Sequence, residues 1–430
     1  MKICIACEYF PPSGPGGGEI SIFYQAEGLA NSGQKVVVVT PEYGATGYEE
    51  EKNMKVCRFP FFKKLKTGEQ CNPLFLANPI FYLYFLFQLV KICRKEGIEI
   101  IHSQTNNAIL PSFLASKILG IRYIATLRDT TLLCAAGLLC LHEEDHTPPH
   151  CGLVRFVQCL WGFDRKYYPE WNLFSRLKSL LNAFFNEMDL SLKRMVLRRA
   201  DAVVTVSDGL KKIYENSGVS GREMVTVYNN PPSEAEVSEA MKEDVARRYN
   251  LKGRRVILSA GKISFGKGTD VLIRSMDQVI GEIPKALFVF LGKKNPLIPF
   301  PEKLKGCYVT PGFIPYQEAQ AFFALADVVV MPSLCQDSLS RVLLEGMNFS
   351  RPLVATKVAG TPEAVIDGKT GIIVERGDHA SLARAIVSLL KDGERAAQMG
   401  REGKMLLESR FRVDRNVAKL LEVYGTGTAG

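Results

Sequence analysis

The sequence lacks several features that would place it in a specialised class. It has no low-complexity segment and no repeat of solenoid period, which excludes low-complexity and repeat architectures. It contains no zinc-finger spacing and no aromatic RNA-binding motif, so we expect no nucleic-acid partner. The residues after Met1 form too short an apolar run for a secretory signal, and we expect a cytoplasmic protein.

Cysteine is present, but it follows no disulfide framework. The eleven cysteines are odd in number and scattered, and several lie in strand-like or helical runs, where buried reduced thiols are typical. One group lies between residues 134 and 159, with three histidines nearby. No pair in it has zinc-finger spacing, so a structural zinc site, free thiols and a disulfide all stay open. The cysteines of this group are Cys134, Cys140, Cys151 and Cys159.

No uninterrupted apolar stretch is long enough to cross a bilayer. Residues 74–93 come nearest, but Pro79 and Lys91 interrupt them, which favours a buried or interfacial helix. Residues 173–199 carry one helical stripe, with apolar side chains at 177, 181, 184, 188, 192 and 195. That stripe belongs either to a packed helix with solvated charges or to a helix facing a membrane. The net charge of +9 favours anionic partners, such as nucleoside diphosphates or an acidic membrane surface.

Length and composition indicate an ordinary globular protein with two domains. The chain has 430 residues, of which 47% are hydrophobic and 23% charged. Short Val/Ile-rich runs alternate with helical stretches, which is typical of parallel strands joined by helices. We therefore predict an α/β fold of two doubly wound, Rossmann-like domains, with a ligand cleft where they face each other. The predicted strands are 2–7, 36–40, 98–103, 122–127 and 201–207, then 256–261, 286–292, 327–333, 352–357 and the end of 367–374.

A glycine-rich loop, GKISFGKGT at 261–269, follows a predicted strand and precedes a helix. Its glycines and Lys267 match a phosphate-binding P-loop up to the eighth position, where Gly268 replaces the Ser or Thr that would bind Mg²⁺. Lys262 and Lys267 remain as cations for a diphosphate. A second loop, PPSGPGGGEIS at 11–21, also opens a helix, but it does not match the G-x-G-x-x-G signature.

Two carboxylates lie in the block PSLCQDSLSRVLLEGM at 332–347. Asp337 falls in the turn after a strand, and Glu345 follows eight residues later on a helix. Carboxylates accept two hydrogen bonds well, so the vicinal hydroxyls of a sugar are natural partners. We expect both side chains to reach one ligand.

These motifs, in this order, resemble glycosyltransferase family 4, the retaining enzymes of GT-B fold. The resemblance covers about residues 1–410, and the carboxylate block, with AGTPEAVIDGKTGIIVERGD after it, is its most specific part. It implies an acceptor domain at 1–228 with an insertion at about 129–200, a donor domain at 229–408, and a C-terminal helix and tail at 409–430 that can cross back to the first domain.

The resemblance also implies roles for matching residues. Glu345 would bind the ribose hydroxyls of a nucleotide sugar, and Asp337 would contact the transferred sugar. Lys262 and Lys267 would neutralise the diphosphate, so that no metal ion or other cofactor is needed. Backbone amides would complete the donor site, namely those of Gly17, Gly18, Leu339, Ser340 and Arg341.

The sequence departs from the family pattern at four of these places. Asp337 stands where Glu is usual, Lys262 where Arg is common, and Ser340 where Gly is frequent. Arg128 occupies the place of a usual His near the acceptor, where it is either a contact for an anionic acceptor or a surface charge.

We therefore expect a metal-independent, hexosyl-transferring glycosyltransferase with retention of configuration. The acceptor would be a saccharide or a lipid-linked saccharide in surface polysaccharide or glycolipid synthesis, and the protein could bind peripherally to the inner face of the membrane. Two other interpretations are a P-loop-type ATPase or kinase and a non-catalytic nucleotide-sugar-binding protein.

Overall fold

The computed structural model divides the chain into two compact units. Unit 1 contains Met1–Tyr228 and Val413–Gly430, and unit 2 contains Asn229–Arg412. The structure describes residues 1–14, 16–44, 48–51, 53–66, 69–71, 73–134, 153–219, 224–231 and 237–425.

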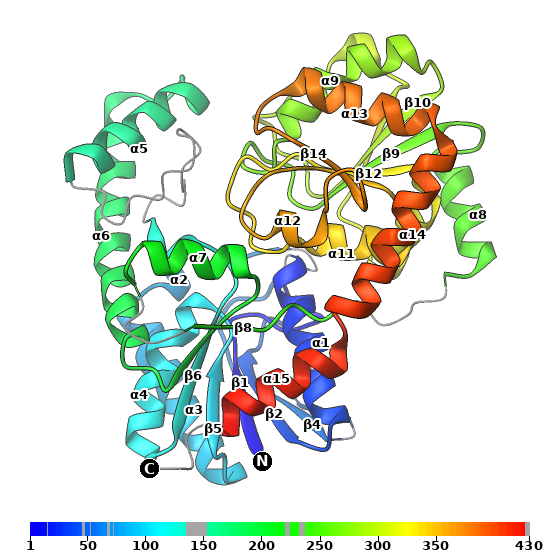
Figure 1. Cartoon of the computed structure of the whole chain (residues 1–430). Helices are drawn as coiled ribbons and strands as arrows, with labels where there is room; N and C mark the ends of the chain where they lie inside the picture. The colour runs from blue at the N-terminus through cyan, green and yellow to red at the C-terminus, as the bar shows by residue number, and fades with distance from the viewer. Residues whose placement is uncertain are drawn as a thin grey trace. The chain divides into compact units, whose positions relative to one another are not determined.

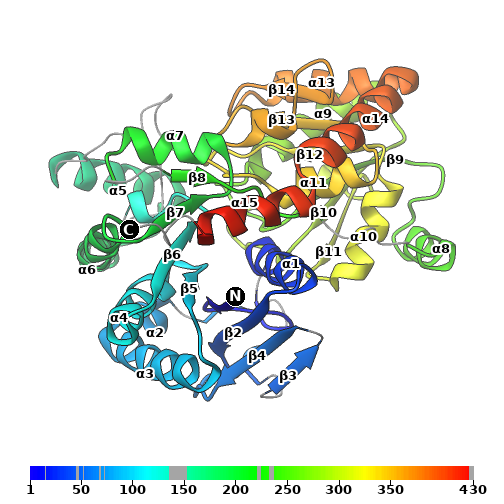
Figure 2. The same ribbon diagram turned by 60° about the horizontal axis from the view of Figure 1, so that its bottom comes forward.

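Unit 1 is built on one eight-stranded sheet in the order β3-β4-β2-β1-β5-β6-β7-β8 (Figures 1 and 2). Every neighbouring pair is parallel except β3 and β4. The central strands are buried, as expected for a sheet covered on both faces. The strands are β1 Lys2–Ala6, β2 Lys35–Pro41, β3 Tyr48–Glu51, β4 Met54–Phe59, β5 Ile100–Ser103, β6 Arg122–Leu127, β7 Ala202–Thr205 and β8 Met224–Thr226.

Alternate residues of the unit 1 strands enter different hydrophobic clusters. Ile3 and Ile5 of β1 pack with α1 and α15, whereas Cys4 and Ala6 pack with α3. The C-terminal helix α15 thus belongs to the core of unit 1, where it contacts α1. The helices are α1 Gly17–Asn31, α2 Pro73–Leu76, α3 Pro79–Glu96, α4 Ile109–Leu119, α5 Leu153–Tyr167, α6 Leu173–Leu197, α7 Asp208–Asn216 and α15 Val413–Gly425, with short 3₁₀ turns η1 Asn106–Ala108 and η2 Thr131–Leu133.

Unit 2 has a six-stranded sheet in the order β11-β10-β9-β12-β13-β14, with every pair parallel. Helices α9 and α13 pack on one face of it, and α11 approaches the other so closely that a Cβ at Gly346 would lie 2.7 Å from the side chain of Leu353. The strands are β9 Arg255–Ala260, β10 Ala286–Leu291, β11 Tyr308–Gly312, β12 Val328–Met331, β13 Leu353–Thr356 and β14 Gly371–Val374. The helices are α8 Glu239–Arg248, α9 Thr269–Glu282, α10 Tyr316–Leu325, α11 Arg341–Asn348, α12 Thr361–Ala364, α13 His379–Lys391 and α14 Gly393–Arg410, with the 3₁₀ turn η3 Glu302–Leu304.

The fold class predicted from the sequence is confirmed, and so are the predicted strands. The list of predicted strands does not include β3, β4, β8 or β11, whose residues lack a long continuous apolar run. Residues 74–93 do not form one helix, because the side chain of Asn78 caps a new helix by accepting from the amide of Phe81 at 2.9 Å. Within the described residues, no helix has the length and apolar character needed to cross a bilayer.

The predicted helix at 173–199 is present as α6, but its apolar stripe does not pack against the unit. The stripe residues, such as Leu181 and Met188, are about half exposed, and the buried contacts come from the opposite side through Leu190 and Leu197. The helix therefore packs on unit 1 through the side opposite its apolar stripe, and the stripe itself faces solvent.

Candidate active site

The glycine-rich loop of unit 2 connects β9 to α9 and lies at a topological switch point. Strand β9 lies between β10 and β12. The strands that follow β9 in the sequence first extend the sheet towards one edge, through β10 and β11, and then towards the other edge, through β12, β13 and β14. In doubly wound sheets, ligands bind at the carboxyl ends of the strands at such a point. The loops after β9 and β12 hold Lys262, Lys267 and Asp337. Three of the predicted donor residues therefore lie where this fold binds ligands.

Backbone contacts fix the loop after β9 against the segment after β12. The carbonyl of Gly266 accepts from the amides of Leu334 (2.9 Å) and Cys335 (3.0 Å). Gly268 caps α9 with φ +67°, and a Cβ there would lie 1.8 Å from the carbonyl oxygen of Pro332. Only glycine permits both the left-handed backbone and this close approach.

The hydroxyl of Thr269 is used inside the glycine loop. It accepts from the amide of Ser264 at 3.2 Å, and Thr269 is buried. The residue nearest to the Mg²⁺-binding position of a P-loop thus stabilises the loop itself. This local geometry argues against the ATPase interpretation.

Lys267 and Asp337 form an ion pair across the two loops. The ammonium of Lys267 donates to Asp337 Oδ2, which also accepts from the hydroxyl of Ser333 at 3.3 Å. The side chain of Lys267 is 38% exposed and that of Asp337 only 12%, so the pair opens to solvent on the lysine side. Lys262 is exposed on the same loop. The arrangement offers cations and one carboxylate at the edge of the sheet.

Glu345 lies in α11 and takes a different set of partners. Its Oε1 accepts from Arg341 Nη2 at 2.7 Å, one helical turn earlier, and from the hydroxyl of Tyr316. Arg341 also donates to the carbonyl of Asn230 at 3.2 Å. Burial lowers the pKa of Arg341, but Glu345 and Tyr316 together outweigh this and the pKa is raised overall. The charged form of Arg341 is stabilised.

The second oxygen of Glu345, Oε2, is buried and has no hydrogen-bond partner among the described residues. A carboxylate oxygen without a donor costs free energy when buried, so such an atom marks a place for a ligand donor. The sequence analysis predicted Glu345 but missed Arg341 and Tyr316 as its partners. The i,i+4 spacing of Arg341 and Glu345 could have indicated the first, whereas Tyr316 is 29 residues away and gives no local signal.

The predicted amide donors lie at the first turns of two helices. Leu339 and Ser340 directly precede α11, which begins at Arg341, and Gly17 and Gly18 begin α1. The first amides of a helix have no partner within it and attract anions. In α1, the carboxylate of Glu19 accepts from the amide of Gly16 at 3.1 Å, and burial raises the pKa of Glu19 to about 7.

Unit 1 has its own switch point, between β1 and β5. Glu8, just after β1, accepts from the backbone and side-chain amides of Asn107 at 2.6 and 3.1 Å. Asn107 accepts in turn from the ammonium of Lys193 at 2.6 Å. Burial raises the pKa of Glu8, opposed by its hydrogen bonds to Asn107. These groups hold the loops after β1 and β5 together, and the sequence pattern predicts no contact between them.

Arg128 follows β6 and is held within unit 1. Its guanidinium donates to the side-chain oxygens of Gln25 (3.0 Å) and Gln104. It is half-buried rather than a freely solvated surface charge. Nearby His102 is buried between Tyr424 and Thr126, and burial, with a smaller contribution from Arg128, lowers its pKa to about 3.

The cysteine-rich segment is described only at its ends. Cys140, Cys151 and the three histidines lie outside the described residues. Cys134 and Cys159 are partly buried beside Leu160 and Ala183. Within the described part of the chain no group of side chains could hold a metal ion, and the zinc prediction stays untested.

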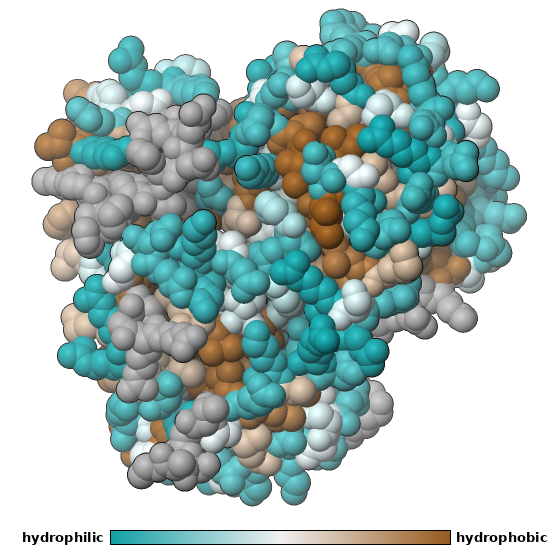
Figure 3. Space-filling view, in the orientation of Figure 1, coloured by the Kyte–Doolittle hydropathy of each residue, from teal (hydrophilic) through white to brown (hydrophobic). Residues whose placement is uncertain are grey.

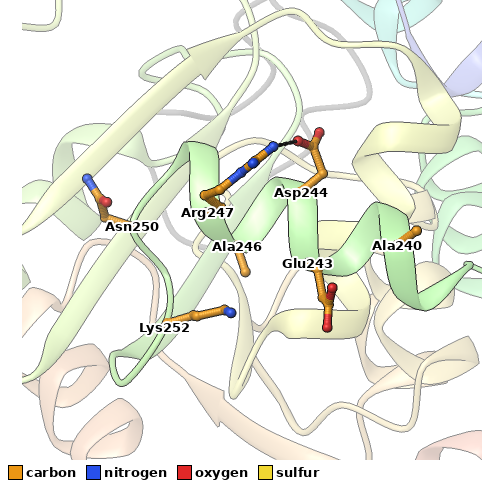
Figure 4. A pocket seen from close by; sticks show the side chains of 7 residues that line it. All are labelled: Ala240, Glu243, Asp244, Ala246, Arg247, Asn250 and Lys252. Atoms are coloured by element: carbon orange, nitrogen blue, oxygen red, sulfur yellow. Dashed lines mark hydrogen bonds and ion pairs between the residues drawn. The ribbon is translucent and has the colours of Figure 1, made fainter.

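A pocket of about 500 Å³ lies along α8 (Figure 4). It includes an ion pair between Arg247 and Asp244 at 2.9 Å. No predicted donor or acceptor residue lines it, so it is separate from the candidate site. Its lining residues are Ala240, Glu243, Asp244, Ala246, Arg247, Asn250 and Lys252.

Two Rossmann-like units, each with charged loops at its switch point, define a protein of the GT-B class. The chain matches the model of Glycosyltransferase Family 4 over residues 15–230 and that of Glycosyl transferases group 1 over residues 254–392. It therefore belongs to glycosyltransferase family 4, which confirms the resemblance seen in the sequence.

Similar proteins of known name include two curated relatives. Spore coat protein SA of Bacillus subtilis is 27% identical over 241 residues, which is 52% of this chain and 64% of that protein. A GDP-mannose-dependent alpha-(1-6)-phosphatidylinositol monomannoside mannosyltransferase of Mycolicibacterium smegmatis is 33% identical over 172 residues, 36% of this chain and 44% of that one. The chain thus spans about half to two-thirds of the length of these relatives.

Solved structures share the fold along the whole chain. Anabaena HepE in complex with UDP-glucose has a TM-score of 0.67 at 17% identity and covers 98% of this chain and 99% of its own. Sucrose-phosphate synthase from Thermosynechococcus elongatus has a TM-score of 0.71 at 18% identity and covers 99% of both chains. At these identities the likeness concerns the fold alone.

Proposed function

We propose that the protein transfers a hexosyl group from a nucleoside diphosphate sugar to an acceptor hydroxyl, with retention of the anomeric configuration. The observation that carries the proposal is the pairing of Lys267 with Asp337 at the switch point of unit 2, on a glycine loop bonded to the segment after β12. A cation beside a carboxylate suits a ligand with phosphate at one end and hydroxyls at the other. Membership of the family supports the same assignment.

In this proposal the donor occupies the edge of the unit 2 sheet. Lys262 and Lys267 bind the diphosphate, assisted by the amides of Leu339 to Arg341. A ribose hydroxyl donates to the buried Oε2 of Glu345, the oxygen that lacks a donor. Asp337 contacts the transferred sugar. The roles predicted from the sequence for Gly17, Gly18 and Arg128, which belong to unit 1, stay predictions.

The reaction that we propose is a front-face displacement. The bond between the anomeric carbon and the phosphate oxygen breaks, and a bond from the acceptor oxygen to that carbon forms on the same face. The acceptor proton passes to an oxygen of the departing diphosphate. The two lysines stabilise the charge that develops on this leaving group, which is the contribution that a metal ion makes in other enzymes. The protein's role is therefore orientation and charge stabilisation.

The similar proteins indicate the classes of donor and acceptor to test first. HepE was crystallised with UDP-glucose, and the mycobacterial relative is named for GDP-mannose and a phosphatidylinositol mannoside. We propose a UDP- or GDP-sugar as donor and a saccharide or lipid-linked saccharide as acceptor, in surface polysaccharide or glycolipid synthesis. We further propose that the enzyme works in the cytoplasm, at the inner face of the membrane.

Thermal shift of the full chain with UDP-, GDP- and ADP-sugars tests this proposal. We expect one nucleotide class to raise the melting temperature without added metal, because the lysines neutralise the diphosphate. Glu345→Gln should remove most of that shift. Glu318→Gln is the matched control, because Glu318 is also paired with an arginine in unit 2, at 3.0 Å from Arg248, and should leave the shift intact.

Two outcomes would overturn the proposal. Stabilisation by ATP with Mg²⁺ alone would assign the loop to a phosphohydrolase. Donor binding without turnover on any saccharide or lipid-linked acceptor would assign the protein to nucleotide-sugar sensing.

A further inference from the structure

Helix α6 carries a broad apolar face that is open to solvent. Nine large hydrophobic side chains along it are between 48% and 76% exposed. At about 100° per residue, they fall within an arc of about 120° around the helix axis. We call these nine residues the α6 face. They are Leu173, Phe174, Leu177, Leu181, Phe184, Phe185, Met188, Leu192 and Met195.

The opposite side of α6 fixes the direction in which this face points. Leu190 and Leu197 pack into the core of unit 1. The ammonium of Lys193 is buried and donates to Asp189 at 2.5 Å and to Asn107 at 2.6 Å. Turning the helix to cover its apolar face would remove these leucines from the core and expose the buried network. The face therefore stays outward as long as the core is intact.

The charges on α6 are arranged to leave a cationic border. Its two carboxylates, Glu187 and Asp189, are each paired with a basic residue of the same helix. Lys178 and, just beyond the helix end, Arg198 and Arg199 are exposed. A surface that is apolar in the middle and cationic at its border complements an anionic lipid headgroup layer.

Aromatic side chains lie at the turn that joins α5 to α6. The rings of Tyr168 and Trp171 stack with centroids 4.3 Å apart, and the guanidinium of Arg176 lies 5.7 Å from the ring of Trp161. Tyrosine and tryptophan favour the boundary between water and hydrocarbon. In Figure 1 the two helices extend beyond the sheet of unit 1, and in Figure 3 some brown and tan side chains are visible at the outer margin of this region.

We propose that the α6 face docks on an anionic lipid bilayer, with the helix lying in the interface rather than across it. A second copy of the chain is a poorer occupant for two reasons. Pairing of two helices needs only a narrow seam of alternating positions three and four apart, whereas the α6 face is broader. The cationic border of one copy would also repel the same border of another.

The full chain can be tested by co-sedimentation with vesicles of phosphatidylcholine alone or mixed with equal parts of phosphatidylglycerol. We expect binding to the mixed vesicles, weakened by salt, and weak binding to phosphatidylcholine. The two tryptophans of the chain, Trp161 and Trp171, both lie in the α5–α6 hairpin. Their fluorescence should shift to shorter wavelength on binding, which reports the docking of this hairpin directly.

Two pairs of variants separate this proposal from its rivals. Phe184→Glu with Met188→Glu should lower the partition coefficient about a hundredfold, since each change removes a large apolar contact with the bilayer. Leu297→Glu with Met405→Glu, two exposed apolar residues of unit 2, is the matched control and should leave it unchanged. Lys178→Gln with Arg199→Gln should weaken binding to the mixed vesicles only.

Three results would overturn the proposal: no vesicle binding by the wild type, equal binding by the Phe184 and Met188 variant, or a wild-type dimer that this variant dissociates while vesicles fail to bind. Circular dichroism of each variant confirms the fold. The thermal shift with the nucleotide sugar tests the proposed donor site of unit 2, whereas the vesicle assay tests the α6 face of unit 1. Failure of one assay therefore does not imply failure of the other.

Discussion

Replacing Gly268 with alanine tests the geometry on which the candidate site depends. A side chain at φ +67° costs roughly 1 kcal/mol. The new Cβ would also lie 1.8 Å from the carbonyl oxygen of Pro332, so the loop must move away from the segment after β12. That movement breaks the two hydrogen bonds accepted by Gly266, each worth about 1 kcal/mol. We expect a loss of about 3 kcal/mol in the free energy of unfolding.

Gly253→Ala is the matched control for this change. Gly253 has φ +72° in the same unit, but a Cβ there meets nothing within 4 Å. Gly253→Ala should lower the free energy of unfolding by only about 1 kcal/mol, which corresponds to a melting temperature roughly 2–4 °C lower. For Gly268→Ala we expect a melting temperature roughly 6–12 °C lower. Calorimetry of the full chain measures both. Equal shifts, or a Gly268→Ala protein that keeps its nucleotide-sugar thermal shift, would refute the argument that the loop must contact Pro332 to form the site.

Three further predictions concern buried charges. Arg341→Met should cost roughly 3–5 kcal/mol in urea unfolding, because it leaves Glu345 charged and buried, and Arg341→Met with Glu345→Leu should recover most of this loss. The pKa of His102 is about 3 in the folded chain and 6.5 for the free side chain, so between these pH values the unfolded state binds one more proton than the folded state. The free energy of unfolding should therefore fall by up to about 1.4 kcal/mol per pH unit as the pH drops from 6.5 towards 3. His102→Asn should flatten this slope. The pKa of Glu19 is raised from 4.5 to about 7, so between these pH values the folded state binds one more proton than the unfolded state. The free energy of unfolding should therefore fall as the pH rises from 4.5 to 7, and Glu19→Gln should abolish that fall.

These pH predictions have opposite signs, which makes them separable in one series of unfolding measurements. A His102→Asn protein that keeps the wild-type slope below pH 6.5 would contradict the buried neutral imidazole. A Glu19→Gln protein with an unchanged slope between pH 4.5 and 7 would contradict the raised pKa of this half-buried carboxyl at the start of α1. For the Arg341 variants, a double variant as unstable as the single one would show that packing, not the unpaired charge, sets the cost.

The sequence predicted the fold because the strands of such sheets are buried on both faces. Runs such as 36–39 and 286–291 are apolar at every position, which is typical of a strand covered on both faces. The edge strands β3 and β11 have mixed composition and depend on pairing with β4 and β10, so no local pattern indicates them.

The candidate site was predictable where its residues share a local motif. The glycine loop and the carboxylate block are each one contiguous segment of the sequence. The contact between Lys267 and Asp337, 70 residues apart, follows only once β9 and β12 are neighbours in the sheet. The Tyr316 contact and the network of Glu8, Asn107 and Lys193 arise from packing between distant elements, which a single sequence does not specify.

The position of α15 has a consequence for how the chain is made. Unit 2 is inserted into unit 1, because the chain leaves unit 1 after Tyr228 and returns at Val413. Tyr424 then hydrogen-bonds to His102 at 2.7 Å and fills the core beside β1 and β5. On the ribosome, unit 2 has all its residues available before unit 1 can close its own interior. Unit 1 is therefore begun before unit 2 but completed after it, and until α15 emerges it must persist with one side of its sheet partly uncovered.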